Sequence, residues 1–74
     1  MKTIKNGARE LEMVTCYRNG DRNAIVCKRA EGNYIVGKNY IMNGDETEVS
    51  WSWGAYDFRT ASDAQKCALA WCNY

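Results

Sequence analysis

The sequence contains no histidine and no proline. Without histidine, the chain lacks the commonest general base, the serine and cysteine triads that depend on it, and most catalytic zinc sites. Its six glycines are scattered singly, so there is no phosphate-binding loop and no dinucleotide fingerprint. Glu46 and Glu48 alternate with serines, as expected for a solvated strand rather than a catalytic acid pair. We therefore expect no enzymatic activity and no cofactor.

Long apolar runs are also absent, which excludes a bilayer-spanning segment. Lys2 and Lys5 are not followed by the apolar core of a signal peptide, so we expect a cytoplasmic protein with no membrane partner. No linker-like stretch divides the 74 residues, and we predict a single domain over residues 1–74. The net charge of +1 gives no general attraction to nucleic acid.

What the chain does have is an alternation of apolar and polar residues that continues from Glu10 to Phe58. Alternation of this kind predicts strands, because side chains point to opposite faces along a strand. The turn signals between them are rich in glycine and asparagine, which accept positive φ: Asn19-Gly20, Glu31-Gly32-Asn33 and Asn43-Gly44-Asp45. The predicted strands are residues 10–17, 23–30, 34–42 and 46–53, with a bulge at Gly37 in the third.

A helix is predicted to begin near Ser62. Ser62 and Gln65 fit a capping box, and Asp63 suits the positive end of the helix. One face of this helix collects mostly small residues, Ala64, Cys67, Ala68, Trp71 and Cys72. The fold class expected is therefore α+β, a four-stranded antiparallel β-meander with one C-terminal α-helix packed on one face, in the order ββββα.

The register decides which sheet face the helix covers. With an even number of residues in each loop, even positions in one strand share a face with odd positions in the next. That face holds Val14, Cys16, Ile25, Cys27, Tyr34, Val36, Tyr40, Met42, Val49, Trp51 and Trp53. A bulge at Gly37 would move Tyr40 and Met42 away. We expect this face to lie under the helix, and replacement of Trp51 or Trp71 by alanine to cost about 3–5 kcal/mol.

The four cysteines are expected to be reduced and to pack as small apolar residues. Cys16 and Cys27 would lie on the face covered by the helix, beside Cys67 and Cys72. A four-thiolate zinc site is thus one alternative and a disulfide another. Structural zinc sites usually take their cysteines from turns, whereas these lie inside regular elements, so we predict no metal.

The second sheet face would carry an apolar patch that no helix covers, formed by Met13, Tyr17, Val26, Ile35 and Ile41. Patches of this kind usually mark protein contacts, and a partner protein, a second copy of the chain or residues 1–9 would cover it. Basic residues gather on the first three strands: Arg18, Arg22, Lys28, Arg29 and Lys38. The predicted partner-binding residues are Met13, Tyr17, Arg18, Arg22, Lys28, Arg29 and Ile35. The arginines would pair with carboxylates or displace phosphate contacts.

One resemblance concerns the segment from Trp51 to Trp71. It reads as a strand, Gly54, Phe58, Thr60 and then a helix with Asp63-Ala64. This pattern resembles the last strand and helix of plant ethylene-response DNA-binding domains and of integrase arm-binding domains. The resemblance implies a sheet that lies in the major groove, with Arg18, Lys28 and Arg29 as its basic residues.

The whole chain resembles small phage-encoded inhibitor proteins, including anti-CRISPR proteins, in its size, its sheet-and-helix architecture and its lack of enzymatic residues. This resemblance implies a non-enzymatic phage or mobile-element inhibitor that binds a host protein or ribonucleoprotein complex. It would sterically block the nucleic-acid or effector site of a host defence complex. The alternative is a DNA-binding module that presents its β-sheet to the major groove, and a steep salt dependence would distinguish it.

Overall fold

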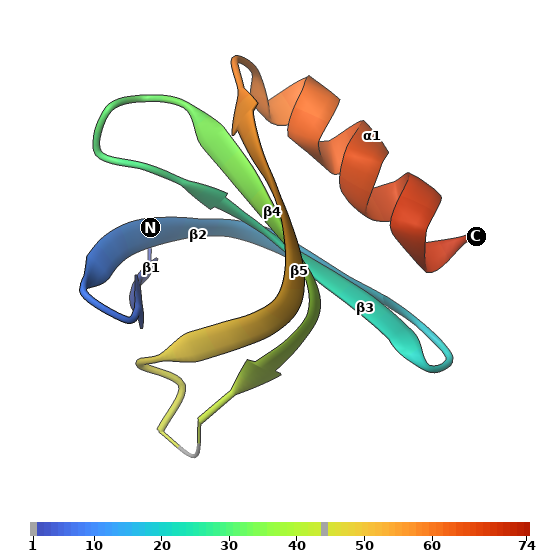
Figure 1. The fold of residues 1–74 in the computed structure, drawn as a ribbon, viewed down its shortest axis with the longest axis horizontal. Coiled ribbons are helices and arrows are strands. Elements are labelled where there is room, and N and C mark those ends of the chain that lie inside the picture. Colours follow the sequence, from blue (N-terminus) through green and yellow to red (C-terminus); the bar gives the residue numbers. More distant parts are fainter. Residues whose placement is uncertain (1, 44) are drawn as a thin grey trace.

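The computed structural model describes residues 2–43 and 45–74, which form a five-stranded antiparallel sheet followed by one helix (Figure 1). The strands neighbour one another in chain order, and they are β1 (Lys2–Asn6), β2 (Arg9–Asn19), β3 (Arg22–Lys28), β4 (Tyr34–Met42) and β5 (Val49–Phe58). The helix is α1 (Ala61–Cys72). The α+β class is confirmed, but the sheet has five strands rather than the predicted four. Residue 44, in the third predicted turn, lies outside the described residues.

The strand that the sequence pattern missed is β1. Ile4 is its one large apolar residue, so the strand shows no alternation to recognise. Ile4 is nevertheless only 1% exposed and pairs with Leu11 of β2. A tight turn at Gly7, with φ +62°, brings β1 back along β2. Residues 2–6 are therefore part of the sheet and its core.

The sheet curls until its two edges meet. The Lys5 N–H donates to the Thr47 carbonyl at 2.9 Å, and the Asn6 side-chain amide donates to the Val49 carbonyl at 2.9 Å. Figure 1 shows how strongly β5 bends along its length. The curled sheet encloses a cluster that we call the inner cluster: Ile4, Leu11, Ile25, Cys27, Ile35 and Val49.

The helix packs on the other side of the sheet, so α1 and β1 lie on opposite sides of the central strands (Figure 1). The cluster beneath it, the helix-side cluster, is formed by Ala24, Val26, Val36, Ala64, Ala68 and Cys72. Its helical members are small, which lets the helix approach the sheet closely. Both faces of β3 and of the first half of β4 are therefore buried.

The helix covers a mixture of the two predicted faces, for two physical reasons. In β3 it covers Ala24 and Val26, which were predicted for the open face, and in β4 it covers Val36, which was predicted for the covered face. Lys28 pairs with Tyr34, so the β3–β4 loop holds five residues, and an odd loop reverses the parity that the prediction assumed. A bulge between Met13 and Thr15 also shifts the register within β2. As a result, the predicted open patch does not exist, because Val26 and Ile35 are fully buried on opposite sides.

Two local predictions within β4 had different outcomes. Gly37 pairs regularly with Ile25 and Gly54, so the bulge predicted there is wrong. Tyr40 and Met42 pack against the inner cluster with Ile25 and Cys27, the face-mates expected from the sequence.

The N-cap of the helix lies two residues before the predicted one. It is Thr60, whose side-chain oxygen accepts a hydrogen bond from the Asp63 N–H at 3.1 Å. The predicted cap, Ser62, lies inside the first turn of α1. Among residues 2–43 and 45–74, no helix is long and apolar enough to cross a membrane.

Candidate cationic and aromatic binding surface

Two cations and three aromatic rings meet where the C-terminal end of α1 lies beside the β2–β3 hairpin. We call this group the cationic–aromatic surface, and its members are Arg22, Lys38, Trp53, Trp71 and Tyr74. The sheet register brings the strand residues together, because Lys38 pairs with Trp53 on one side and with Ala24 on the other. Arg22 lies two residues from Ala24 on the same strand face.

The Arg22 guanidinium contacts two aromatic rings. Its Cζ is 4.3 Å from the ring centroid of Trp71 and 4.9 Å from that of Tyr74. One of its nitrogens also donates to the Trp71 carbonyl at 3.3 Å. Stacking of this kind favours arginine, whose planar cation is attracted to ring faces. The remaining N–H groups of the guanidinium have no hydrogen-bond partner among the described residues and can donate to a ligand.

Trp71 is the centre of the surface and is held from several directions. Its indole Nε1 donates to the Asn23 carbonyl at 3.1 Å. The Lys38 Nζ lies 5.4 Å from its ring centroid, and the ring of Trp53 lies 5.6 Å away, tilted by 58°. These contacts join α1, β3, β4 and β5 at one point, so the surface is built on regular elements rather than on a loop.

The hairpin adds to the capping of the helix C-terminus, where the Asn73 N–H already donates to the Leu69 carbonyl at 3.0 Å. The last turn of α1 contains no basic residue. Asn19 donates its side-chain amide to the Cys72 carbonyl at 3.0 Å and to the Asn73 side-chain oxygen at 3.1 Å. Together with Arg22, it satisfies carbonyls that a helix end leaves unpaired and places a positive charge at the negative end of the helix dipole.

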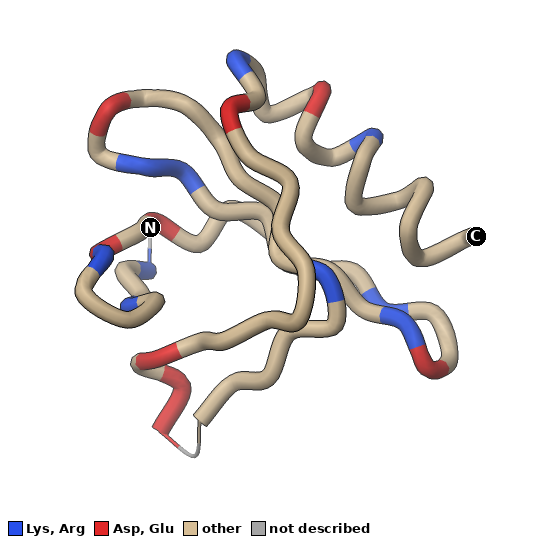
Figure 2. The backbone as a smooth tube through the Cα atoms, in the orientation of Figure 1, with Lys and Arg blue, Asp and Glu red and all other residues tan. Residues whose placement is uncertain are grey.

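The surface is open to solvent and carries unneutralised positive charge. Trp53 is 57% exposed and Tyr74 is 92% exposed. The ion pairs within residues 2–43 and 45–74 are Lys2–Glu46, Arg29–Glu31 and Arg29–Asp57, and none of them involves Arg22 or Lys38. Figure 2 shows basic positions on the hairpin and on the neighbouring strand, on the side of the molecule where the C-terminus lies.

The basic residues predicted from the sequence do not converge on one site. Arg22 belongs to the surface. Arg18 is exposed on the same hairpin, and its neighbour Tyr17 packs against the helix-side cluster. Lys28 is the last residue of β3, about 20 Å from Arg22 at the usual rise per strand residue, and Arg29 follows it. Arg29 is paired there with Glu31 at 3.0 Å and with Asp57 at 3.7 Å.

The predicted apolar anchors are core residues to different degrees. Ile35 is fully buried in the inner cluster, so its prediction as a surface anchor is wrong, for the reason of register given above. Met13 is partly buried against the same cluster. Tyr17 is partly buried against the helix-side cluster. None of the three forms an open apolar patch.

Sequence reasoning missed the aromatic half of the surface. It assigned Trp53 and Trp71 to the core, and it counted Lys38 among the basic residues without selecting it. Only the exposure of Tyr74 could be predicted from the sequence, because this aromatic residue lies beyond the end of the helix. Which tryptophans are exposed depends on the position of the helix, and that position followed from the loop parity.

The groove-reading mode implied by the ethylene-response resemblance needs an open sheet face. Residues 23–27 of β3 are buried without interruption, because the helix covers one face and the curled sheet encloses the other. Of the three tryptophans, only Trp51 packs against the inner cluster. A ligand therefore meets the edge and end of the sheet rather than its face.

The cysteines do not converge as the zinc alternative required. Cys27 lies in the inner cluster, whereas Cys67 and Cys72 pack with the helix-side cluster. All four cysteines are free, and in the described part of the chain no three histidine, cysteine or acidic side chains gather into a metal site. Burial and the neighbouring Cys16 raise the pKa of Cys27 to about 12, and burial raises the pKa of Cys72.

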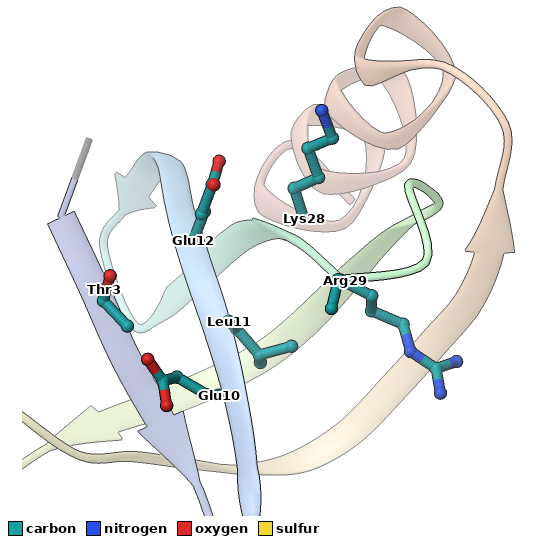
Figure 3. Close-up of a pocket in the computed structure, with 7 residues that line it drawn as sticks. Thr3, Glu10, Leu11, Glu12, Lys28 and Arg29 are labelled. Atoms are coloured by element: carbon teal, nitrogen blue, oxygen red, sulfur yellow. The ribbon is translucent and has the colours of Figure 1, made fainter.

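A separate hollow of about 320 Å³ opens where β2 diverges from β3, beyond the pair formed by Glu12 and Lys28. Figure 3 shows its lining side chains, with Glu10 and Thr3 on one side and Arg29 extending away on the other. The walls carry both signs of charge, and Arg29 is already paired with acidic residues. Its lining therefore selects no single class of ligand.

Comparisons with models of protein families, with curated proteins and with solved structures gave no match to this chain.

Proposed function

We propose that this protein is a non-enzymatic inhibitor of phage or mobile-element origin that docks on a host defence nucleoprotein complex in the cytoplasm. The observation that carries the proposal is the Arg22 guanidinium lying over the rings of Trp71 and Tyr74, with no carboxylate partner in the described part of the chain. Cations beside exposed aromatic rings suit a partner that presents phosphates and bases.

The mechanism is steric. The molecule measures 30 × 29 × 20 Å, and a body of this size seated over a nucleic-acid channel excludes a strand from it. The surface is supported by two core clusters and a capped helix end, so little ordering is needed when it binds. Inhibition by occlusion needs no catalytic group.

The proposal is tested with tagged protein incubated in bacterial lysate, in nuclease-treated and untreated halves. The retained complex is then purified, and its binding to its nucleic-acid target is measured with and without added inhibitor. We expect a discrete complex whose target binding is lost on addition of the protein. The doubly substituted variant Lys38→Ala/Trp53→Ala should neither be retained nor inhibit.

The matched control is Ile41→Ala, which also removes an exposed apolar side chain, 70% exposed and outside the cationic–aromatic surface. It should inhibit like the unsubstituted protein. Equal inhibition by all three proteins, or retention of a complex whose target binding is unchanged, would count against the proposal.

A second candidate is a nucleic-acid-binding module that acts without a protein partner. The exposed rings of Trp53 and Tyr74 favour it, because bases stack on such rings. In the lysate experiment, this function predicts that nucleic acid alone is retained, and that nuclease or moderate salt removes it.

A further inference from the structure

We infer that the cationic–aromatic surface binds a single-stranded segment of nucleic acid, with bases stacked on Trp53 and Tyr74 and phosphates held by Arg22 and Lys38. This inference rests on the proposed function and specifies which part of the nucleoprotein complex the surface contacts. Four observations lead to it: the order of the contacting groups, the free charges, the closed sheet and the exposure of the outer rings.

The rings and the guanidinium form a contiguous row, in which the rings of Trp71 and Trp53 are tilted by 58° rather than stacked face to face. Its order is Tyr74, Arg22, Trp71 and Trp53, with successive separations of 4.9, 4.3 and 5.6 Å. The inner members contact one another, whereas the terminal rings of Tyr74 and Trp53 are 92% and 57% exposed. The two terminal rings are therefore open to further planar groups. Nucleic-acid bases are such groups, and stacking accepts any base because every base has a π-face.

The two cations are placed to contact a phosphate backbone beside those bases. Arg22 is fixed by its two rings and by its bond to the Trp71 carbonyl, so its donor edge has a defined direction. A guanidinium edge of this kind binds phosphate oxygens in a bidentate manner. Lys38 adds a second positive charge across the Trp71 ring. Neither cation has an ion-pair partner among the described residues.

A single strand fits these features better than a duplex. In a duplex, the faces of the bases are stacked on each other and cannot reach Trp53 or Tyr74. The sheet cannot lie in the groove of a duplex, because the helix and the curled sheet bury both faces of residues 23–27. An acidic peptide would satisfy the cations but would leave the terminal rings without planar partners. The chemistry is common to single-stranded RNA and DNA.

The test is fluorescence anisotropy with four labelled probes. Three are nucleic acids of twelve nucleotides or base pairs, oligo-dT, oligo-U and a mixed-sequence duplex, and the fourth is a poly-glutamate peptide. We expect both single strands to bind at least about tenfold more tightly than the duplex or the peptide. With two phosphates contacted, log affinity should fall with log salt at a slope of about −1.4. The preference between oligo-dT and oligo-U then shows whether the 2′-hydroxyl contributes.

The variants separate stacking from charge. Trp53→Ala should weaken single-strand binding about tenfold, and Trp53→Phe should restore most of it, because phenylalanine keeps a ring. Lys38→Ala should reduce the salt slope to about −0.7. Ile41→Ala is the matched control and should bind normally, and melting curves for each variant show that it is folded.

Duplex or peptide binding as tight as single-strand binding would overturn the inference, and so would an unchanged affinity for Trp53→Ala. If the single strands do not bind but the protein still blocks a nuclease-treated complex, the inference fails and the proposed function stands. If neither the probes nor a complex is bound, both fail.

Discussion

The indole ring of Trp51 occupies the space that a Cβ atom on Gly37 would fill. Gly37 lies in β4 opposite Gly54 of β5, and Trp51 is partly buried against the inner cluster. The neighbouring Tyr56 lies over Gly54 in the same way, and its hydroxyl accepts a hydrogen bond from the Trp51 Nε1 at 3.2 Å. Gly37 is therefore required by packing rather than by an unusual φ.

Replacing Gly37 with alanine should destabilise the fold by about 1–3 kcal/mol, because a methyl group there displaces a packed ring. Urea denaturation measures this change. In a Trp51→Ala background, the same Gly37→Ala substitution should cost much less, since the ring that it meets is gone. An equal cost in both backgrounds would show that the indole is not the reason for the glycine.

Ile4 tests whether β1 is part of the folded core. Ile4→Ala should cost about 2–5 kcal/mol, the range for truncating a buried isoleucine, because its side chain is only 1% exposed in the inner cluster. Ile41→Ala removes the same atoms from a side chain that is 70% exposed, so it should change the free energy of unfolding by less than about 0.5 kcal/mol. Similar midpoints for the two variants in urea would place β1 outside the cooperative fold.

The helix cap gives a third stability test. Thr60→Ala should cost about 1 kcal/mol, because the Asp63 N–H loses its acceptor. Ser62→Ala should change stability by only a few tenths of a kcal/mol, since alanine is a good helix former within the first turn. Thermal melts of the two variants decide between the caps, and a larger loss for Ser62→Ala would restore the one predicted from the sequence.

The sequence was sufficient to predict four of the five strands and the helix, because alternation and turn residues are local signals. It was insufficient for the packing of those strands. The parity of the loop from Arg29 to Asn33 decides which face Val26 and Val36 share, and turn residues alone do not fix whether a loop holds four residues or five. β1 was missed because Ile4 is its only buried residue and a single apolar residue shows no alternation.

The candidate site was predictable to a smaller extent. Arg22 could be selected because positive charge on a hairpin is visible in the chain. Its contact with the rings of Trp71 and Tyr74 was not visible, because those rings come from the end of α1 and reach Arg22 only when the helix lies on the Val26 face. Residues distant in sequence are joined here by the register, which is a property of the whole sheet.

The buried thiol of Cys27 and the hydroxyl of Tyr40 predict a loss of stability at high pH. Burial and the neighbouring Cys16 raise the pKa of Cys27 from 9.0 to about 12, and burial and a hydrogen bond with Cys16 raise the pKa of Tyr40 from 10.0 to about 12. The unfolded chain releases these protons near pH 9 and 10, whereas the folded chain holds them until about pH 12. The stability present below pH 9 should therefore be lost progressively between pH 9 and pH 12.

For Cys27 the expected slope is on the order of 1 kcal/mol per pH unit once the unfolded thiol has ionised, whereas Tyr40 is only partly buried and solvent screening makes its contribution smaller. Urea denaturation at pH 8, 9.5 and 10.5 measures it. Cys27→Ala should be less stable at every pH, because the substitution leaves a small cavity. Its stability should depend less on pH between 9 and 10, because the thiol is gone and the tyrosine contribution begins only near pH 10. A Cys27→Ala profile parallel to that of the unsubstituted protein, or a stability that rises over this range, would show that the thiol ionises in the folded protein as readily as in the unfolded chain.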